Sequence, residues 1–433
     1  MQINYYELTK LSEQEIAKIS RRSETDIEDI QEAIKPVIKD VAEKGDLALI
    51  EYCEKFDKVI LSPDQIKVTE EEFAIAEKNL DPSIKKVIEA SAENIKKFHK
   101  AQMPEEMWFK QIDDGIMAGE KITPITSVGL YVPRGKGSFP SVMLMLCIPA
   151  VIAQVPRVIV CTPPTPEGTV DDASLFTARL CGIKDVYKAG GAQAIAAMAY
   201  GTETIPKVDK ALGPGSIYVS AAKRLLYGRL DVGTPAGPSE SIILCDEHTD
   251  PEIAALDLLI EAEHGPDSTA LLVTHSENLA KRVASLLPDL IEELPEERRA
   301  FCKSGFSNYG GIMLTPDFKA SIDFINDFAP EHLEVLVADP MAALSKIDNA
   351  GEILLGPYTP ITCGNFSLGV NAILPTGGFA KTFSCVTVYD FLKRSSIGYM
   401  TKEGYDKISD TAATFAEYEG FPAHASAIRK RKF

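Results

Sequence analysis

The segments Ser127-Val128-Gly129-Leu130-Tyr131-Val132 and Val158-Ile159-Val160-Cys161 decide the fold. Both are short apolar runs followed by Pro-rich turns, a pattern typical of strands that are buried on both faces of a sheet. Strand-like and helix-like stretches continue the alternation at Ala173–Leu180, Asp185–Ala189, Ala192–Tyr200 and Lys210–Leu212. Strands that alternate with helices predict an α/β unit with a parallel sheet.

A second series of the same kind follows from about residue 240. Its predicted strands are Ile242–Cys245, Ala270–Thr274, Ile312–Thr315, Leu333–Val337 and Ile353–Leu355, with helices at Pro251–Glu263 and Leu279–Leu287. The first hundred residues have helical periodicity. After Pro375 the chain becomes Gly-rich and then polar and helical. A tail with few apolar residues of its own is expected to dock on other helices or on a second subunit.

Charge and composition exclude several classes of protein. The chain has 433 residues, and 45 Lys plus Arg against 63 Asp plus Glu give a formal charge of −18. An acidic chain whose longest basic run is Arg429-Lys430-Arg431-Lys432 has no electrostatic footprint for nucleic acid or anionic lipid. A small-molecule ligand is expected.

Targeting and redox signals are weak. The N-terminus has no signal-peptide pattern, and the apolar run Val142–Ile152 is too short to span a bilayer, so we expect a cytoplasmic protein. Eight scattered cysteines without a C-x-x-C pair are expected to be reduced, buried thiols.

Three Gly-rich turns follow predicted strands of the first series, but none has the spacing G-x-G-x-x-G. They are Pro133-Arg134-Gly135-Lys136-Gly137, Gly190-Gly191-Ala192-Gln193 and Gly213-Pro214-Gly215-Ser216. A helix that opens at Gly190-Gly191 presents free N–H groups to an anion, as in dinucleotide-binding turns. Glycine also serves tight turns for backbone reasons alone, so both interpretations stand.

Three of the six histidines, His264, His332 and His424, lie near carboxylates in turn-rich settings that suit ligands and bases. Glu261 and His264 are three residues apart, so on a helix they share a face and can hold one cation. The alternative is a histidine that interacts with the dipole at a helix C-terminus. Glu331 and His332 place an acid next to a base before a strand, which suits a general base or a solvated turn.

Several blocks of the sequence carry a family resemblance. They occur in this order: Gly129-Leu130-Tyr131-Val132-Pro133, Gly190-Gly191-Ala192-Gln193-Ala194, Pro235-Ala236-Gly237-Pro238-Ser239-Glu240, Ala262-Glu263-His264-Gly265-Pro266-Asp267-Ser268, Pro330-Glu331-His332-Leu333 and Leu374-Pro375-Thr376. In order and content the chain resembles histidinol dehydrogenases over nearly its whole length.

The resemblance implies an α/β fold with two incomplete Rossmann-like parallel-sheet domains and small terminal helical segments that mediate dimerisation. It implies four parts: residues 1–22 as an N-terminal segment, 23–128 with 240–376 as the substrate and metal domain, 129–239 as the NAD domain, and 377–433 as the dimerisation tail. The implied enzyme is a homodimer that uses zinc and NAD to oxidise a primary alcohol through an aldehyde to a carboxylate.

The resemblance also implies roles for particular residues. His332 would take the hydroxyl proton of the alcohol, and Glu331 would activate the water that attacks the aldehyde. Zinc would be held by Glu261, His264, Asn365 and His424. Tyr131, Gln193 and Ser216 would lie at the NAD site. Substrate would contact Ser239, Glu261, His264, His332, Asn365, Glu419 and His424, with Glu419 and His424 supplied by the partner subunit.

Four positions depart from the family pattern. The family's usual metal ligands are Gln, His, Asp and His, so Glu261 and Asn365 exchange an amide for a carboxylate and a carboxylate for an amide. The ligand set keeps one negative charge, and oxygen ligands of either kind coordinate zinc. Ala372 replaces a histidine near the bound amino alcohol, and Ser216 replaces an asparagine.

These departures leave three functional hypotheses. The default is oxidation of L-histidinol to L-histidine, the end of histidine biosynthesis. The second keeps the chemistry but takes another small polar alcohol, as the sulfopropanediol dehydrogenases that resemble this family do, because loss of an imidazole from a polar pocket shifts specificity. The third is a non-catalytic scaffold that retains the fold.

Overall fold

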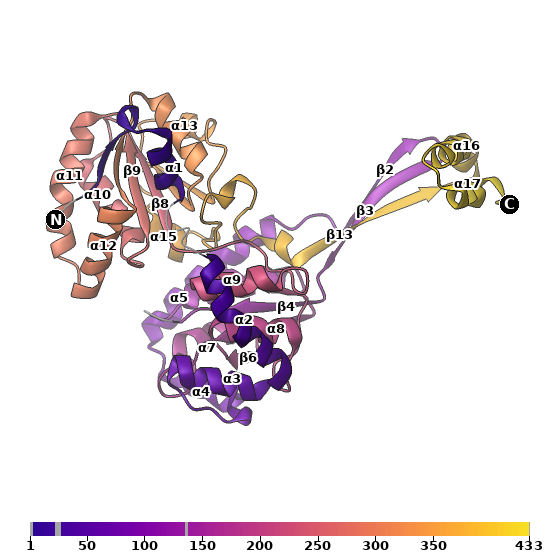
Figure 1. Cartoon of the computed structure of the whole chain (residues 1–433), viewed down its shortest axis with the longest axis horizontal. Coiled ribbons are helices and arrows are strands. Elements are labelled where there is room, and N and C mark those ends of the chain that lie inside the picture. Colours follow the sequence, from indigo (N-terminus) through magenta and orange to yellow (C-terminus); the bar gives the residue numbers. More distant parts are fainter. Residues whose placement is uncertain (1–2, 22–26, 135–136, 433) are drawn as a thin grey trace. The chain divides into compact units, whose positions relative to one another are not determined.

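The computed structural model describes residues 3–21, 27–134 and 137–432. The chain forms two compact units (Figure 1). The main unit comprises Met1–Gln102 and Thr126–Phe391, and the C-terminal unit comprises Met103–Ile125 and Leu392–Phe433. Gly135 and Lys136 of the first Gly-rich turn, and the expected boundary at residue 22, lie outside the described residues.

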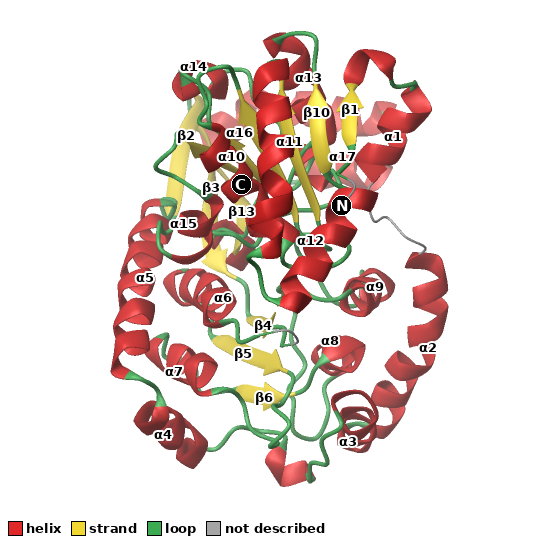
Figure 2. Ribbon diagram, turned by 90° about the vertical axis from the view of Figure 1, so that its left-hand side faces the viewer, coloured by secondary structure: helices red, strands yellow, loops and turns green. Residues whose placement is uncertain are grey.

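The first sheet of the main unit has four parallel strands in the order β6-β5-β4-β7. The strands are β4 (Ser127–Tyr131), β5 (Arg157–Thr162), β6 (Val186–Lys188) and β7 (Lys210–Leu212). Helices cover both faces (Figure 2). One layer is α2 (Ile27–Lys44), α3 (Asp46–Tyr52), α8 (Gly191–Tyr200) and α9 (Ile217–Leu226), and the other is α4 (Glu70–Asn79), α5 (Pro82–Ala101), α6 (Pro140–Ile152) and α7 (Asp172–Leu180).

The helices of residues 27–101 belong to this four-stranded sheet. The expected division, which placed residues 23–128 with residues 240–376 in one domain, stays a prediction. Ile34, Val37 and Val41 of α2 are buried in one cluster with side chains of α8 and α9. The apolar stripe of α2 identified its buried face, but a stripe carries no information about which of two sheets will cover it.

The second sheet of the main unit has six parallel strands in the order β1-β10-β9-β8-β11-β12. The strands are β1 (Tyr5–Glu7), β8 (Glu240–Cys245), β9 (Thr269–Thr274), β10 (Gly311–Leu314), β11 (His332–Val335) and β12 (Glu352–Leu355). One face packs on α10 (Pro251–Ala262), α11 (Glu277–Glu292), α12 (Glu296–Asn308) and α15 (Ile361–Phe366), and the other on α1 (Glu13–Arg21), α13 (Phe318–Phe328) and α14 (Pro340–Leu344). Two parallel sheets with helical layers confirm the predicted fold class.

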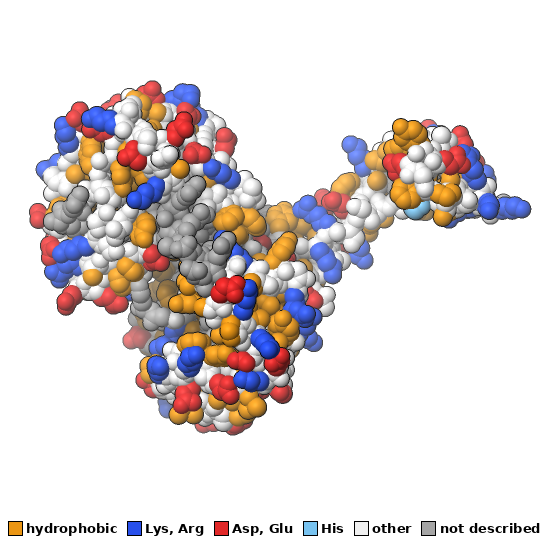
Figure 3. All heavy atoms as spheres, in the orientation of Figure 1, with side chains coloured by type: hydrophobic (Ala, Val, Ile, Leu, Met, Phe, Trp, Pro, Cys, Tyr) orange, Lys and Arg blue, Asp and Glu red, His pale blue; other side chains and the backbone are white. Residues whose placement is uncertain are grey.

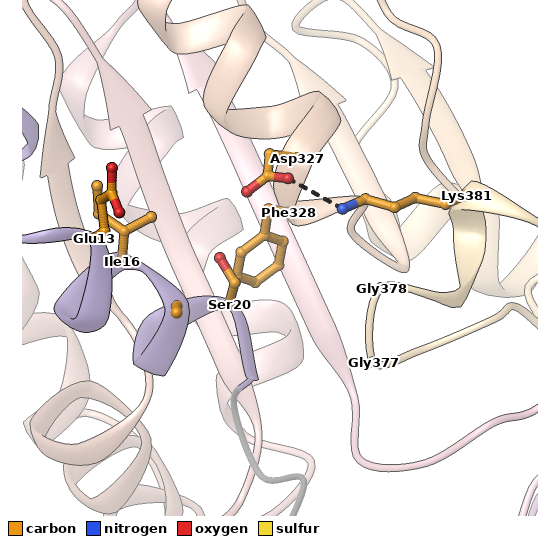
Figure 4. A pocket seen from close by; sticks show the side chains of 9 residues that line it. Glu13, Ile16, Ser20, Asp327, Phe328, Gly377, Gly378 and Lys381 are labelled. Atoms are coloured by element: carbon orange, nitrogen blue, oxygen red, sulfur yellow. Dashed lines mark hydrogen bonds and ion pairs between the residues drawn. The ribbon is translucent and has the colours of Figure 1, made fainter.

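The N-terminal residues are part of the six-stranded sheet. Tyr5 pairs with Ile312 as β1 adds to the sheet edge, and Ile19 of α1 packs against the core. A cavity of about 500 Å³ separates α1 from the end of α13 and from Gly377 and Gly378 (Figure 4). Within it Lys381 Nζ lies 3.1 Å from the carboxylate of Asp327. The positive charge of Lys381 in this cavity is therefore already paired with a carboxylate.

The C-terminal unit holds a three-stranded antiparallel sheet in the order β13-β3-β2. Its elements are β2 (Met107–Asp113), β3 (Ile116–Pro124), β13 (Leu392–Met400), α16 (Lys402–Tyr418) and α17 (Pro422–Arg429). The helical tail was predicted, but the three strands were not. Leu392 pairs with Pro124, so this sheet joins segments far apart in the chain, and no local pattern announces such a pairing.

Shorter features complete the fold. Single turns of 3₁₀ or π-helix occur at Leu8–Lys10, Cys53–Asp57, Pro63–Gln65, Phe379–Lys381 and Val388–Phe391. All eight cysteines are free and six of them are buried, in line with the expected thiols. Over residues 3–21, 27–134 and 137–432, the helices lack the combined length and apolar character that a bilayer crossing needs.

Candidate active site

The predicted acid and base residues gather where strands of the six-stranded sheet begin. His332 is the first residue of β11, Glu352 is the first residue of β12, and the two are paired in register. Glu240 likewise begins β8, the neighbour of β11 on its other side. Because the strands are parallel, their first residues meet at one edge of the sheet.

His332 is the centre of this group. Its Nδ1 lies 2.8 Å from Glu352 Oε2, and its Nε2 lies 3.8 Å from Glu261 Oε1 and 4.0 Å from Glu331 Oε1. The ring is 3% exposed. Nδ1–H therefore donates to Glu352, which fixes the ring and directs Nε2 toward the other two carboxyl groups.

Glu331 is fixed by the backbone of the neighbouring strand. The N–H of Glu240 donates to Glu331 Oε2 over 2.8 Å, and Glu240 Oε1 in turn accepts from the N–H of Gly377. Burial raises the pKa of Glu331 well above its ordinary value, with Glu261 and Glu240 adding to the shift and His332 opposing it. A buried carboxyl group with a raised pKa is a candidate for proton transfer.

Glu261 and His264 come together at the end of α10. Glu261 is fully buried, and its Oε2 lies 2.7 Å from His264 Nδ1. Asn365 Nδ2 on α15 donates to Glu261 Oε1 over 3.0 Å, and Ser239 Oγ lies 3.0 Å from His264 Nδ1. Four residues that the sequence assigned to one site are thus brought together.

The charges of this group depend on one another. Burial alone would raise the pKa of Glu261, but the nearby His264 and His332 outweigh burial and lower the pKa to about 2. Burial would likewise lower the pKa of His332, yet Glu261, the hydrogen bond to Glu352 and the Glu331 charge raise it to about 10. In the chain by itself His332 is therefore an imidazolium beside an ionised Glu261 at neutral pH.

The donor atoms around Glu261 fit a cation. Glu261 Oε2 is buried and has no hydrogen-bond partner, although His264 Nδ1 is only 2.7 Å away. A carboxylate oxygen and an imidazole nitrogen are both atom types that bind zinc, so the two neighbouring side chains suit one cation. Among the described residues, no group of three or more His, Cys, Asp or Glu side chains is arranged to hold a metal ion. The third nearby donor is the Asn365 amide.

Two predicted site residues lie in the C-terminal unit. Glu419 follows α16 and His424 lies on α17, and both are exposed. The ring of His424 packs against Phe421 within the unit, with 5.2 Å between ring centroids. Their expected contribution to a metal and substrate site therefore stays a prediction.

The residues expected at the NAD site belong to the four-stranded sheet. They lie at the edge where its strands end, whereas the acid and base residues lie where strands of the six-stranded sheet begin. Tyr131 ends β4, and its hydroxyl accepts a 3.0 Å hydrogen bond from the N–H of Gly191, the first residue of α8. Gln193 is buried two residues further along α8. Ser216 is exposed at the N-cap of α9 and its side chain makes no capping bond.

Glycine is required where the turn after β7 meets β4. Gly213 has φ +125°, and a Cβ there would lie 2.0 Å from the carbonyl oxygen of Tyr131. Only glycine tolerates both that conformation and that approach. The Gly213-Pro214-Gly215-Ser216 turn thus owes its first glycine to contact with the strand that carries Tyr131.

Glu352 and Glu240 are site residues that the sequence interpretation missed. Each is an acidic residue at the first position of a buried strand, and each lies beside the strand that starts with His332. A charged residue opening a buried strand was visible in the sequence. The strand order that brings it to His332 was not.

Comparison with known proteins agrees with this architecture. The profile of the histidinol dehydrogenase family matches residues 20–432. A histidinol dehydrogenase from Synechocystis sp. is 55% identical over 425 residues, 98% of both chains. A histidinol dehydrogenase homolog from Colwellia psychrerythraea is 50% identical over 98% of this chain and 96% of its own.

A solved structure matches as well. The crystal structure of histidinol dehydrogenase from Elizabethkingia anophelis superposes with a TM-score of 0.93 at 34% identity, covering 99% of this chain and 97% of that one. Fold and site together define a two-sheet α/β protein with a buried acid–imidazole centre. The chain belongs to the histidinol dehydrogenase family.

Proposed function

We propose that the protein is a zinc-dependent, NAD-linked dehydrogenase that oxidises a primary alcohol through an aldehyde to a carboxylate, with L-histidinol as the default substrate and L-histidine as the product. The observation that carries the proposal is His332, held at Nδ1 by Glu352 while its Nε2 faces Glu261 and Glu331. Family membership supports the same reaction class.

His332 serves as the base for the alcohol. Loss of hydride from an alcohol carbon requires removal of the hydroxyl proton, and Nε2 is the ring nitrogen available for it. A cation held by Glu261 would weaken the acidic influence that raises the pKa of His332 most, and so would favour the neutral ring that a base requires. Glu352 then steadies the ring through Nδ1 during transfer.

Glu331 serves the second oxidation. The aldehyde must add water before it can lose a second hydride, so a group that takes a proton from water is needed. Glu331 has one oxygen held by the N–H of Glu240 and the other 4.0 Å from His332 Nε2. Its raised pKa makes the ionised carboxyl group a stronger proton acceptor than an ordinary glutamate.

Zinc and NAD supply what the side chains lack. Glu261, His264 and Asn365 would hold the metal, with His424 from a second subunit, and the metal would polarise the alcohol oxygen. NAD would accept the hydride, bound where Tyr131 and Gln193 flank the start of α8 and where Ser216 opens α9.

A homodimer is proposed because the C-terminal unit does not cover its own apolar surface. Figure 3 shows hydrophobic side chains at the surface of this unit. Large exposed apolar residues on it are Met103, Met107, Trp108, Phe109, Ile112, Met117, Tyr399, Met400, Ile408, Phe415, Tyr418 and Phe421. Apolar surface of this extent is typical of an interface. A second copy of the chain is the proposed cover, and it would receive Glu419 and His424.

The second candidate reaction takes another small polar alcohol, and Ala372 favours it. Ala372 is half-buried between the buried Asn371 and Ile373, where family members carry a histidine. A methyl group there can neither donate nor accept a hydrogen bond to a substrate imidazole or amine. The Glu261 and Asn365 exchange adjoins the same segment, because Asn365 precedes it on α15.

An NADH-release assay separates the candidate reactions. The purified protein is incubated with zinc, NAD and either L-histidinol or a panel of polyols, amino alcohols and sulfonated diols. Turnover of L-histidinol with two NADH per alcohol supports the default reaction. Turnover of another alcohol without histidinol oxidation overturns the default and selects the second candidate.

Metal analysis tests the scaffold alternative. About one zinc per chain after gentle purification supports an enzyme. A metal-free protein that does not take up zinc and oxidises no alcohol in the panel would make the scaffold the better description.

A further inference from the structure

Helix α5 holds the segment that connects two positions of interest, the candidate metal ligand Asn365 and the departure from the family pattern at Ala372. The segment, residues 366–373, runs from the end of α15, which carries Asn365, to the position of Ala372. Although α5 packs on α6 and α7 over the four-stranded sheet, it also contacts the end of α15 of the six-stranded sheet at Phe366 (Figure 2). Contacts follow one another along α5 in the same order as the residues of the segment.

Three side chains of α5 make these contacts. Ser91 Oγ donates to the carbonyl of Phe366 over 2.6 Å, and Asn94 Nδ2 donates to the carbonyl of Ser367 over 2.8 Å. Gly369 has φ +106°, and a Cβ there would lie 2.8 Å from the Asn94 carbonyl, so the segment passes directly against the helix. The series ends at His99, whose Nε2 lies 3.2 Å from Asn371 Nδ2.

The orientation of the Asn371 amide is fixed by its other partners. Its Oδ1 accepts from the N–H of Ile373 over 3.0 Å, and its Nδ2 donates to the carbonyl of Met145 over 2.8 Å. The group that faces His99 is therefore an N–H, and Nε2 of the ring must be the acceptor. Nδ1 then carries the proton and donates to Gln102 Oε1 over 2.8 Å.

This network is satisfied only with a neutral ring. A protonated His99 would set its Nε2–H against the amide N–H of Asn371 in a fully buried place. Burial lowers the pKa of His99, and the hydrogen bond to Gln102 opposes that shift only in part. Neutral pH therefore keeps the contact intact.

The surroundings contain few groups that could reverse this preference. On α5 itself Lys96 is half-buried, and Lys97 and Lys100 are exposed. Helix α6 offers only Cys147 as a titratable side chain, and residues 366–373 offer none. The turn at Val388–Phe391 offers Tyr389 and Asp390, of which Asp390 lies 3.7 Å from Lys210 and bonds to Thr387.

We propose that His99 and Asn371 are a positioning pair, which seats residues 366–373 on α5 and so places Asn365 and Ala372, and which holds only while His99 is neutral. Neither residue of the pair is among those proposed to bind the alcohol or NAD. Its role in the reaction rests on the proposed function, whereas its structural role does not. The pair should affect binding of the alcohol's side chain, because Ala372, which the family resemblance places near the bound alcohol, directly follows Asn371.

Hydrogen exchange on the full-length protein tests the structural role. Amide protection of residues 366–373, corrected for intrinsic exchange, is measured by mass spectrometry from pH 8 to pH 4.5. We expect the wild type to lose about 2–10-fold of this protection on acidification below the pKa of His99, the usual worth of one hydrogen bond. Protection in this segment that does not change with pH would overturn the proposal.

Matched variants identify the ring as the cause. His99→Gln keeps an acceptor for Asn371 that cannot be protonated, so its protection should stay high at both ends of the range. His99→Phe keeps the bulk without an acceptor, so its protection should be low at all pH values. Lys97→Gln on the exposed side of α5 is the control and should behave as the wild type. A His99→Gln variant that loses protection on acidification as the wild type does would also overturn the proposal.

Kinetics then test the link to the reaction. With the alcohol that the protein oxidises, His99→Phe should raise the KM for the alcohol about 2–10-fold while the KM for NAD stays unchanged, and His99→Gln should restore it. Exchange results as expected with an unchanged KM for the alcohol would overturn the positioning role alone. If no alcohol is oxidised, the proposed function fails while the exchange experiment still decides the pair.

Discussion

The two parallel sheets of the main unit carry their candidate site residues at opposite edges. At the six-stranded sheet the candidate residues His332, Glu352 and Glu240 are the first residues of strands. At the four-stranded sheet Tyr131 is the last residue of its strand, and Ser216 follows β7 after a short turn. Ligands of open parallel sheets normally bind at the carboxyl ends of strands. The expected NAD residues of the four-stranded sheet agree with that rule, whereas the candidate residues of the six-stranded sheet lie at the other edge.

The two edges also differ in charge. The amino edge of the six-stranded sheet buries carboxyl groups around one imidazole, with pKa values of about 2 for Glu261 and about 10 for His332. The expected NAD residues Tyr131, Gln193 and Ser216 are uncharged. The difference teaches that one edge is suited to moving protons and holding a cation, and the other to binding by shape and neutral hydrogen bonds. Variants at the two edges should therefore fail in different ways.

The largest expected effect is loss of the metal. His264→Ala and, if the site is shared between subunits, His424→Ala should each lose zinc and all measurable turnover, because each removes a ligand. Mixing the two under conditions of proven subunit exchange should restore about a quarter of wild-type activity, since half of the random dimers carry one intact site. Zinc content and NADH release check both points. No recovery despite exchange would contradict a shared site.

Next in size is loss of the base. His332→Asn should keep zinc but lower alcohol oxidation by at least ~10², a typical share for a general base. Zinc content measured beside kcat separates this failure from the previous one. An unchanged rate would remove His332 from the mechanism.

Removal of the residue that orients the base should cost less. Glu352→Gln keeps the shape but offers a neutral partner to His332 Nδ1, so activity should fall about 10–100-fold with zinc retained. The substitution also removes one acidic influence that raises the pKa of His332. The acid limb of the pH–rate profile should therefore move to lower pH. A limb that stays in place would argue that Glu352 does not govern the base.

The smallest expected effect lies at the other edge. Tyr131→Phe removes the hydroxyl that accepts from Gly191, so the KM for NAD should rise about 2–10-fold, with kcat and zinc content unchanged. Gln193→Glu is a second and more disruptive variant at this edge, because it would introduce a charge into a neutral buried position. A fall in kcat with an unaltered KM for NAD in Tyr131→Phe would contradict the proposed difference between the two edges.

Local pattern predicted much of this molecule. The strands of both parallel sheets that carry site residues were anticipated within a few residues, since apolar runs between Gly- and Pro-rich turns reflect burial directly. Family motifs placed Glu261, His264, Ser239 and Asn365 in one site, and the structure brings these four together. The strands of the C-terminal unit escaped because β13 pairs with β3, far away in sequence.

The sequence by itself determined the class of fold, and through the family resemblance it predicted Glu331 and His332 as acid and base and revealed the exchange between Glu261 and Asn365, because these are properties of residues and their neighbours along the chain. Only the tertiary structure decided which strands lie side by side. That order brings Glu352 to His332 Nδ1 and seats residues 366–373 on α5 through His99. The reason is physical: register and strand order are set by the packing of whole elements, and each element's own pattern specifies a buried face but not the neighbour that will cover it.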